Sequence, residues 1–310
     1  MNKITDTYDV IVLGGGPAGL TAGIYLGRAK LKTLIINEGS IGGQMVLTHA
    51  IANYPGAKVD ISGRDLSLDM KAQAKTFGCK IESNVEVTSM DLSGELKQIE
   101  IDDDEVFAAK AVIVATGGTP RSMGVPGETK FKGSGVSYCA TCDGDFFEGK
   151  EIIVVGGGNS ALEEAVSLTQ YASKVTVIHQ FDHFQATEHA VKIARENEKI
   201  AFIMESEIQA VLGDQTLTGV ELMNMKTNQR SIVSTDGIFV FIGYVANTVA
   251  LPGSLALNSR NEIVTDAAMM TNLDGVFAAG DVREKRYRQI TTAVSDGTIA
   301  ALSAIDFIQS

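Results

Sequence analysis

Two cysteines three positions apart are the residues of this sequence with the clearest chemical potential. Cys139-Ala-Thr-Cys142 is followed directly by Asp143, an acid able to exchange protons with a thiol. Such a pair is typical of a redox-active dithiol, of half of a metal site, or of two small buried side chains. The residues around the pair are needed to separate these interpretations.

The metal interpretation lacks ligands. A zinc site needs about four, but Cys79, the third cysteine, is far upstream, and the four histidines show no spacing that would complete a site with it. We therefore expect no metal. Cys79, in the segment TFGCKIE, is interpreted as a small buried hydrophobic side chain.

Length and composition indicate what kind of protein carries the pair. The chain has 310 residues, 45% of them apolar, which is enough for two domains with buried cores. A formal net charge of -12 opposes binding to nucleic acid or to an anionic membrane. The start, MNKITDTYDVIVLGGG, lacks the features of a signal peptide, so a cytoplasmic location is expected. Cytosolic thiols are kept reduced, which favours a catalytic or metal-binding pair over a structural crosslink.

A glycine-rich loop near the start predicts a nucleotide site. In YDVIVLGGGPAGLTAGIYLGRA an apolar strand at 8–13 leads to Gly14, Gly16 and Gly19 and then to a helix. The first glycine allows a tight turn, the second lets backbone approach a pyrophosphate, and the third lets the helix pack on the strand. The positive end of the helix faces the phosphates. Glu38, which ends the next strand, lies where an acid reads a ribose hydroxyl.

The same pattern returns in the middle of the chain. In KEIIVVGGGNSALEEAVSLTQYA a strand at 151–155 leads to Gly156, Gly158 and Ala161 and then to a second helix. Two such loops, each between a strand and a helix, are much stronger evidence than one. The next strand ends at His179 with no acid or arginine beside it. This loop is either a second nucleotide site or only a tight turn.

The order of the apolar segments predicts a first domain that is interrupted by a second. The chain is expected to leave the first domain after the strand in AAKAVIVATGG and to return to it after the strand in GIFVFIGYVANT. The later segment DGVFAAGDV is again apolar, like the strands of the first half. We expect linkers near 117–125 and 243–248. The predicted domains are 1–117 with 248–310, and an inserted domain, 118–247, which carries the cysteine pair.

Other segments complete the first domain. A helix is expected at about 62–77, and charged and polar strands between 80 and 107 are expected to form a meander that covers the first sheet. The turn-rich segments 41–45 and 53–56 would bring backbone amides close to a ligand.

The motifs GGGPAG, GGQM, NYPG, ATGG, CATCDG, GGGNSA, FVFIGY and GVFAAGDV…YRQ occur in one order along nearly the whole chain. In this order and spacing the sequence resembles the low-molecular-weight thioredoxin reductases. The resemblance implies an α/β protein of two Rossmann-like, three-layer (ββα) nucleotide-binding domains, the second inserted in the first. It also implies a homodimer that reduces a thioredoxin-like protein.

The resemblance assigns roles to the cysteine segment. It implies that Cys142 lies against the flavin of FAD and forms a charge-transfer thiolate, that Cys139 attacks the partner's disulfide, and that Asp143 donates and accepts the proton. The chemistry accounts for the spacing, because two intervening residues bring the sulfurs within disulfide reach and allow a thiolate to be stabilised at a helix start. FAD is expected because hydride must be handed to sulfur through a cofactor.

The resemblance also assigns the cofactor-binding residues. Those expected to hold FAD are Gly14, Gly16, Pro17, Ala18, Gly19, Glu38, Gly43, Gln44, Asn53, Thr116, Gly117, Gly280, Asp281, Arg288 and Gln289. Those expected to hold a nicotinamide nucleotide are Gly156, Gly158, Asn159, Ser160, Ala161 and His179.

One segment departs from the family pattern. Members that use NADPH carry His-Arg-Arg-x-x-x-Arg after the strand, and here the segment is HQFDHFQ, with Gln180, Phe181 and Gln185 at the arginine positions. A 2′-phosphate would lose its charge-assisted partners and would meet Asp182. A donor other than strictly NADPH is expected: NADH, either nicotinamide, or reduced ferredoxin.

Two alternatives stay open at this point. A basic group on the following helix, Lys192 or Arg195, would restore recognition of the phosphate if NADPH proved to be the preferred donor. The chain is alternatively a flavin-dithiol redox sensor or regulatory binding module that reports redox state without turnover. The retained Cys139, Cys142 and Asp143 favour the enzyme.

Overall fold

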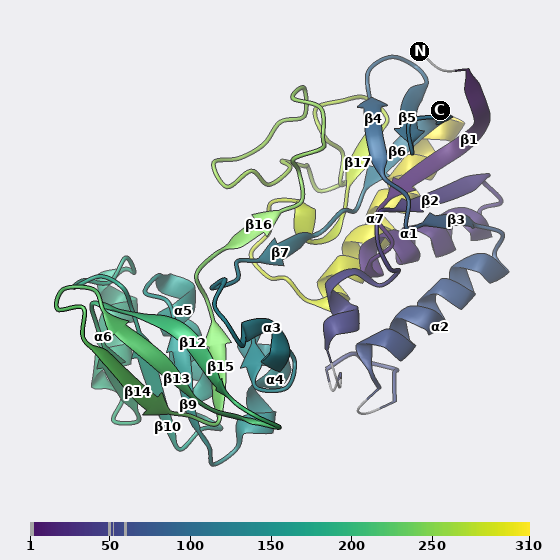
Figure 1. Ribbon diagram of the computed structural model, residues 1–310. Helices are drawn as coiled ribbons and strands as arrows, with labels where there is room; N and C mark the ends of the chain where they lie inside the picture. Colours follow the sequence, from purple (N-terminus) through teal and green to yellow (C-terminus); the bar gives the residue numbers. More distant parts are fainter. Residues whose placement is uncertain (1–2, 49–50, 52, 59–60) are drawn as a thin grey trace. The chain divides into compact units, whose positions relative to one another are not determined.

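The computed structural model describes residues 3–48, 51, 53–58 and 61–310. The chain divides into two compact units (Figure 1), one formed by residues 1–119 and 245–310 and the other by residues 120–244. The expected boundaries, at 117/118 and 247/248, differ from these by two or three residues. The two connecting segments, β7 (Gly118–Pro120) and β16 (Tyr244–Ala246), pair with each other as a two-stranded sheet.

The first unit is built on a seven-stranded sheet in the order β3-β2-β1-β6-β5-β4, with β17 also paired to β6. Strands β1, β2, β3, β6 and β17 run parallel, whereas β5 and β4 extend the sheet antiparallel. The strands are β1 (Ile4–Leu13), β2 (Thr33–Asn37), β3 (Lys80–Ser83), β4 (Val87–Asp91), β5 (Lys97–Ile101), β6 (Glu105–Val114) and β17 (Val276–Ala278).

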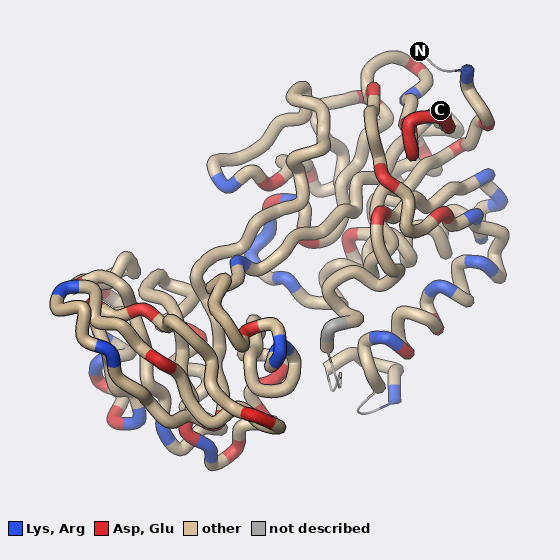
Figure 2. The backbone as a smooth tube through the Cα atoms, viewed as in Figure 1, with Lys and Arg blue, Asp and Glu red and all other residues tan. Residues whose placement is uncertain are grey.

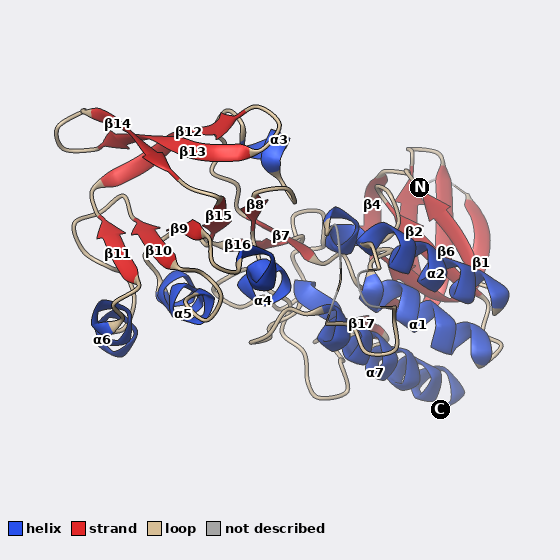
Figure 3. Ribbon diagram, turned by 90° about the horizontal axis from the view of Figure 1, so that it is seen from below, coloured by secondary structure: helices blue, strands red, loops and turns tan. Residues whose placement is uncertain are grey.

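Helices α1 (Pro17–Arg28), α2 (Gly63–Thr76) and α7 (Ile290–Gln309) lie on one face of this sheet (Figure 3). Alternate residues of β1 enter two cores: Val10 and Val12 face the helices, and Ile11 and Leu13 face the opposite side. Both faces of the strand are buried over residues 10–13, which explains why this part of the strand is apolar without alternation. Two 3₁₀ turns, η1 (Gly43–Leu47) and η3 (Gly280–Val282), lie in loops of this unit.

The expected meander was partly wrong. Residues 80–83 form β3, which pairs parallel to β2 because α2 provides the crossover that a parallel neighbour needs. Strands β4 and β5 do form an antiparallel pair, but they continue the hydrogen-bonded sheet at its edge. Ile99 and Ile101 of β5 nevertheless pack in one cluster with Ile11 and Leu13 on the sheet face opposite the helices, so this pair covers that face as expected.

The second unit has three layers. A parallel sheet in the order β11-β10-β9-β15-β8 carries helices on one face, and the antiparallel sheet β12-β13-β14 covers the other (Figure 3). The strands are β8 (Val136–Ser137), β9 (Glu151–Val155), β10 (Lys174–Ile178), β11 (Ile200–Ile203), β12 (Ser206–Gly213), β13 (Leu217–Asn224), β14 (Arg230–Ser234) and β15 (Gly237–Val240). The helices are α3 (Glu128–Phe131), α4 (Ala140–Asp143), the 3₁₀ turn η2 (Gly144–Phe147), α5 (Asn159–Leu168) and α6 (Glu188–Glu196). Both units are therefore Rossmann-like α/β domains, as the sequence predicted.

Candidate active site

The two cysteines of the inserted unit form a disulfide, with their Cα atoms 5.3 Å apart. Cys139 is the extended N-cap residue of α4, and Cys142 lies within that short helix. Both cysteines follow β8 at the edge of the parallel sheet. This Cα separation lies within the range that a disulfide requires.

The carboxyl of Asp143 accepts a hydrogen bond of 2.6 Å from the hydroxyl of Ser137. Burial raises the pKa of Asp143 above its ordinary value, the Ser137 hydrogen bond lowers it in part, and the nearby Asp145 raises it further. A shift in this direction brings the pKa of the carboxyl closer to the pH range in which a group both gives and takes a proton.

Sequence reasoning missed Ser137. It is the last residue of β8, it is buried, and its hydroxyl also accepts from the backbone N–H of Cys139 at 3.1 Å. The available signal was a serine two positions before Cys139, in the segment that leads into the pair.

The first glycine loop has the shape that a pyrophosphate requires. A Cβ at Gly14 would lie 2.2 Å from the carbonyl oxygen of Ala115, and one at Gly19 would lie 1.9 Å from the carbonyl oxygen of Gly14. A Cβ at Gly16 would meet no atom within 4 Å. Gly14 and Gly19 are therefore needed for packing, whereas the backbone at Gly16 faces open space at the start of α1.

Neighbouring segments are hydrogen-bonded to this loop. The N–H of Gly42 donates to the carbonyl of Gly15, and the N–H of Gly15 donates to the side chain of Asn37, both at 2.8 Å. Gly43 has a positive φ, and a Cβ there would lie 3.4 Å from the Cα of Gly16. The remaining predicted residues of this region lie around the loop: Pro17 opens α1, Ala18 is buried in it, Glu38 is exposed just after β2, and Gln44 is exposed in η1.

The loop at Gly280 lies against the same helix. A Cβ at Gly280 would come within 2.9 Å of the Cβ of Ala18, and the N–H of Gly280 donates to Asp296. The Oδ1 atom of Asp281 is buried and has no hydrogen-bond partner among the described residues. Burial raises the pKa of Asp281 to about 6; Lys285 and Arg288 oppose the shift, and Asp296 adds to it. A buried acceptor without a donor fits a ligand hydroxyl at this point.

The other predicted FAD residues form three further contacts. Thr116 donates to the backbone of Asn247 at 2.8 Å, and Gly117 next to it has a positive φ. The amide of Asn53 donates to Gln289 at 3.4 Å, and Gln289 caps α7. Arg288 forms an ion pair with the buried Glu262, which sequence reasoning did not identify. The structure thus brings residues from both halves of the first unit to the carboxyl ends of its parallel strands, where such folds bind ligands.

The second glycine loop has the same geometry as the first. A Cβ at Gly156 would lie 2.4 Å from the carbonyl oxygen of Phe241, whereas one at Gly158 would meet nothing within 4 Å. Ala161 is fully buried beneath the loop and Ser160 is exposed at the start of α5. The side chain of Asn159 accepts from the N–H of Thr187 at 2.7 Å. The backbone at Gly158 therefore faces open space at the start of α5, as the backbone at Gly16 does at the start of α1.

The segment after β10 is aromatic where the family pattern is cationic. The buried ring of His179 is stacked on Phe184 and makes an edge contact with Phe181. Phe181 is stacked on His183, which bonds to Asp182 at 2.6 Å. Gln180 and Gln185 are exposed, and the backbone N–H of Gln185 donates to the carbonyl of Gly157.

Two basic groups lie near this segment. The guanidinium of Arg195, on α6, is 6.0 Å from the ring of Phe184, and Lys226 pairs with Glu205 at 3.4 Å. The pKa of Asp182 is lowered mainly by its hydrogen bond with His183, and Lys226 adds a smaller effect in the same direction. Lys192 pairs with Glu196 at 3.8 Å. The Nε2 atom of His179 is buried and has no hydrogen-bond partner among the described residues.

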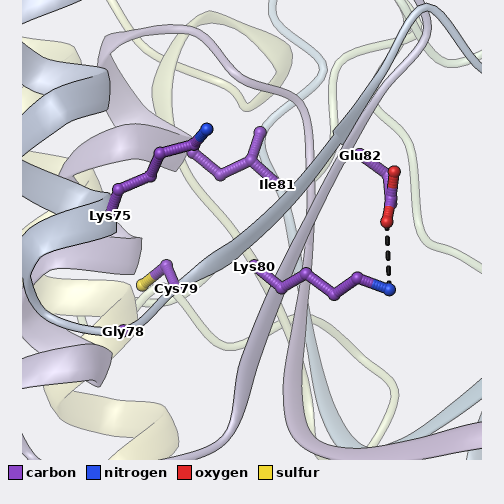
Figure 4. A pocket seen from close by; sticks show the side chains of 6 residues that line it. All are labelled: Lys75, Gly78, Cys79, Lys80, Ile81 and Glu82. Atoms are coloured by element: carbon purple, nitrogen blue, oxygen red, sulfur yellow. Dashed lines mark ion pairs between the residues drawn. The ribbon is translucent and has the colours of Figure 1, made fainter.

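A separate open pocket of about 480 Å³ lies where α2 leads into β3 (Figure 4). It is lined by Lys75, Gly78, Cys79, Lys80, Ile81 and Glu82, and Lys80 pairs with Glu82 across it. Cys79 is buried, its thiol donates to the carbonyl of Gly23, and burial raises its pKa to about 11. The thiol is therefore protonated at neutral pH, and the thiolate is the nucleophilic form of cysteine. The pocket lies at the amino end of β3, opposite the glycine loop.

Lysine and arginine residues are interspersed with aspartate and glutamate along both units (Figure 2). Within the described residues, no helix has both the length and the apolar character needed to span a membrane.

Comparison with known proteins agrees with this geometry. The family model for pyridine nucleotide-disulphide oxidoreductases matches residues 8–297. The thioredoxin reductase of Peptoclostridium acidaminophilum is 42% identical over 311 residues, which cover 98% of each chain. A 34.2 kDa protein in the rubredoxin operon of Clostridium pasteurianum is 43% identical over 300 residues, or 97% of each chain.

The solved structures lead to the same group. The crystal structure of thioredoxin reductase from Streptococcus pyogenes superposes with a TM-score of 0.93 at 40% identity and covers 98% of both chains. The thioredoxin reductase of Giardia duodenalis gives a TM-score of 0.92 at 34% identity, covering 99% of this chain and 100% of the other. The chain therefore belongs to the pyridine nucleotide-disulphide oxidoreductases and, among them, to the low-molecular-weight thioredoxin reductases.

Proposed function

We propose that this protein passes electrons through FAD and the Cys139–Cys142 dithiol to the disulfide of a thioredoxin-like protein. Its donor is one that need not carry a 2′-phosphate: NADH, either nicotinamide, or reduced ferredoxin. The observation that carries the proposal is the formed Cys139–Cys142 disulfide with the partly buried Asp143 next to it. Assembly as a homodimer and a cytoplasmic location are proposed from the family resemblance.

The residues at the pair account for the exchange reaction. The Cys139 thiolate attacks one sulfur of the partner's disulfide, which releases a partner thiolate and forms a mixed disulfide. The Cys142 thiolate then attacks Sγ of Cys139, which releases the second partner thiolate and restores the Cys139–Cys142 disulfide. Two electrons move to the partner, and Asp143 takes the proton from one thiol and returns it to a leaving thiolate.

The first unit fits FAD, because Gly16 leaves space for a pyrophosphate and Asp281 offers a buried, unpaired acceptor. Bound FAD would supply the two-electron chemistry that delivers reducing equivalents to sulfur. We assign its binding to the glycine loop and helix start with Glu38, to the turn at Gly43, and to the loop at Gly280. The full set is Gly14, Gly16, Pro17, Ala18, Gly19, Glu38, Gly43, Gln44, Asn53, Thr116, Gly117, Gly280, Asp281, Arg288 and Gln289.

The donor proposal follows from the end of β10. Charge-assisted contacts are worth about 1.5–3 kcal/mol each, so the loss of two or three arginines weakens binding of a 2′-phosphate by orders of magnitude. Arg195 lies over Phe184 and Lys226 pairs with Glu205, so both cations already have partners. NADH has no 2′-phosphate and loses nothing by the replacement.

The test of the donor uses a variant that does not disturb the fold. Because a Cβ at Gly158 meets no atom within 4 Å, Gly158→Ala should fold normally but block close approach of a pyrophosphate. Anaerobic mixing with NADPH, NADH or chemically reduced ferredoxin then measures flavin reduction in the wild type and in the variant. A nicotinamide donor should be slowed at least tenfold by the substitution, whereas ferredoxin should be unaffected.

Restoring the arginines gives the reciprocal test. Gln180→Arg, Phe181→Arg and Gln185→Arg together should raise the rate with NADPH more than the rate with NADH. Fast reduction of the wild type by micromolar NADPH, with strong preference over NADH, would reject the donor proposal and point to Arg195 or Lys192. A wild type that is reduced but never turns over a disulfide substrate would instead support the redox-sensor alternative.

A further inference from the structure

Ser137 connects the redox-active pair to its acid. Its hydroxyl donates to Oδ2 of Asp143 at 2.6 Å and accepts from the backbone N–H of Cys139 at 3.1 Å. The Cys139 carbonyl oxygen, 3.3 Å away, is a second acceptor for the same hydroxyl proton. A single buried hydroxyl therefore contacts both the residue that is expected to attack the substrate and the residue that is expected to move the proton.

The fold holds this hydroxyl in place. Ser137 is a strand residue of β8, and it is paired with Phe239 of β15, which is fully buried. Asp143 lies in a helix of one turn, α4, whose own backbone bond to Cys139 is 3.2 Å long. Among the described residues, no other side chain bonds to the Asp143 carboxyl. Strand β8 therefore holds the Ser137 hydroxyl in place, and the short helix α4 carries the Asp143 carboxyl that this hydroxyl orients.

We propose that Ser137 is a positioning residue of the dithiol reaction, which holds the Asp143 carboxyl beside the Cys139–Cys142 turn and stabilises its ionised form. The proposal rests on the proposed function, because it takes Asp143 to be the proton carrier of the exchange.

The chemistry explains what the hydroxyl contributes. A dithiol that reduces a disulfide gives up two electrons and two protons, and the carboxyl must be ionised to take a proton from a thiol. Burial and Asp145 both favour the protonated carboxyl, and Ser137 opposes them. Asp145 is the charged neighbour that acts on Asp143 among the described residues, and no charged group of α5, the helix packed on α4, contributes.

Removal of the Ser137 hydroxyl should change the pKa of Asp143 in a defined direction. In Ser137→Ala the ionised carboxyl loses its hydrogen bond, so the pKa of Asp143 rises further. The fraction of ionised Asp143 at a given pH falls, and the limb of the pH–rate profile that belongs to this carboxyl moves to higher pH. The carboxyl also loses its orientation, so the rate at neutral pH should fall by about tenfold.

The matched control is Ser206→Ala. Ser206 is in the same unit and is 5% exposed, as Ser137 is, and its hydroxyl donates to the carbonyl of Met204. The Ser206→Ala substitution removes a buried serine hydroxyl without changing any contact of the Cys139–Cys142 turn. Holoenzyme reduced with dithionite is mixed with 5,5′-dithiobis(2-nitrobenzoate) between pH 5 and 9, and release of the coloured thiolate gives the rate in a single turnover. The rate and pH limb of Ser206→Ala should match those of the wild type.

The Asp143→Asn background tests whether Ser137 acts through the acid. Ser137→Ala should change the rate less than twofold there, because the titrating group is gone. The proposal is overturned if Ser137→Ala behaves like Ser206→Ala, or if it lowers the rate equally in both backgrounds.

A second readout does not depend on flavin or on turnover. In the dithiothreitol-reduced Cys142→Ser variant, the rate at which iodoacetamide alkylates Cys139 is measured by mass spectrometry as a function of pH. This profile should show an inflection at the pKa of Asp143, and replacement of Ser137 should move that inflection to higher pH. An unchanged profile would reject the role of Ser137 even if the enzyme is active. Failure of the wild type to reduce any disulfide would reject the proposed function and leave this readout able to decide on Ser137.

Discussion

At the scale of single residues, the glycines of the first loop separate into two kinds. Gly19 is needed for packing, because a Cβ there would lie 1.9 Å from the carbonyl oxygen of Gly14. Gly16 has an ordinary φ of -79° and faces open space. The same sequence motif therefore contains one glycine that the packing requires and one that leaves open space at the start of α1.

We expect Gly19→Ala to lower the free energy of unfolding by at least about 2 kcal/mol, because the backbone must shift to admit the methyl group. Gly16→Ala should unfold like the wild-type apoprotein but bind FAD at least tenfold more weakly. Urea denaturation of the apoproteins and titration with FAD measure the two effects. Equal losses of stability in both variants would contradict the distinction.

Asp281 gives a prediction about pH. Its pKa is raised from 3.8 to about 6 by burial. Between these two pH values the folded protein keeps a proton on this carboxyl that the unfolded chain has released. Its contribution to stability is full below about pH 4 and is lost as the pH rises through about 6. The ionised, partly buried carboxyl therefore destabilises the apoprotein at neutral pH.

Asp281→Asn should remove this dependence. The variant apoprotein should match the wild type near pH 4 and exceed its free energy of unfolding by roughly 2–3 kcal/mol at pH 7. It should also bind FAD more weakly, because it loses the ionised acceptor. Urea denaturation at pH 4, 5, 6 and 7 checks the trend, and a difference that is constant across this range would refute the assignment.

At the scale of elements, one buried carboxylate joins three segments of the second unit. Glu128, at the start of α3, accepts hydrogen bonds from Ser122, from the N–H groups of Met123 and Gly124, and from the hydroxyl of Tyr138. Burial acts to raise the pKa of Glu128, but these bonds outweigh it and the pKa is lowered. The end of the linker is thereby tied to the residue that precedes Cys139.

Glu128→Gln should lower the free energy of unfolding by about 2–4 kcal/mol, because an amide cannot accept from every donor that now faces an oxygen. Tyr138→Phe removes one bond and should cost about 1–2 kcal/mol. Glu198→Gln, an exposed glutamate of the same unit, is the control and should change little. Chemical denaturation gives all three values, and the expected order fails if Glu128→Gln is no worse than Tyr138→Phe.

At the scale of the whole molecule, the second unit is continuous in sequence and the first is not. The inserted unit has its own two hydrophobic clusters, one on each face of its parallel sheet. The first unit takes β17 and α7 from the C-terminal segment. The two units should therefore differ in their ability to fold as fragments.

A fragment of residues 118–247 should fold alone with one cooperative transition. It contains Cys139 and Cys142 but not Cys79, so the oxidised fragment should show no free thiol and the reduced fragment two. Residues 1–117 alone lack α7, which packs against α1, and should not fold. Circular dichroism during heating and thiol titration measure both outcomes; a fragment 118–247 without a thermal transition would contradict the expected independence.

The sequence by itself determined the two glycine loops, the cysteine pair and the interruption of one domain by another. These features depend on local requirements: a tight turn before a helix, two sulfurs within reach of each other, and apolar runs that end where a strand ends. Strand β9 was predicted at 151–155 and observed at Glu151–Val155 for this reason. The missing arginines after β10 were also visible, because they are a matter of residue type.

Only the tertiary structure decided which polar groups meet. Ser137 and Asp143 are six positions apart with a helix start between them, Glu262 pairs with Arg288, and Asn37 holds Gly15 from another strand. Strand β3 likewise became a parallel member of the sheet because of a crossover, whereas its polar composition had suggested a meander. Residue type and spacing specify local conformation, but the partner of a buried polar group depends on which strands become neighbours, and that choice is made by packing of the whole core.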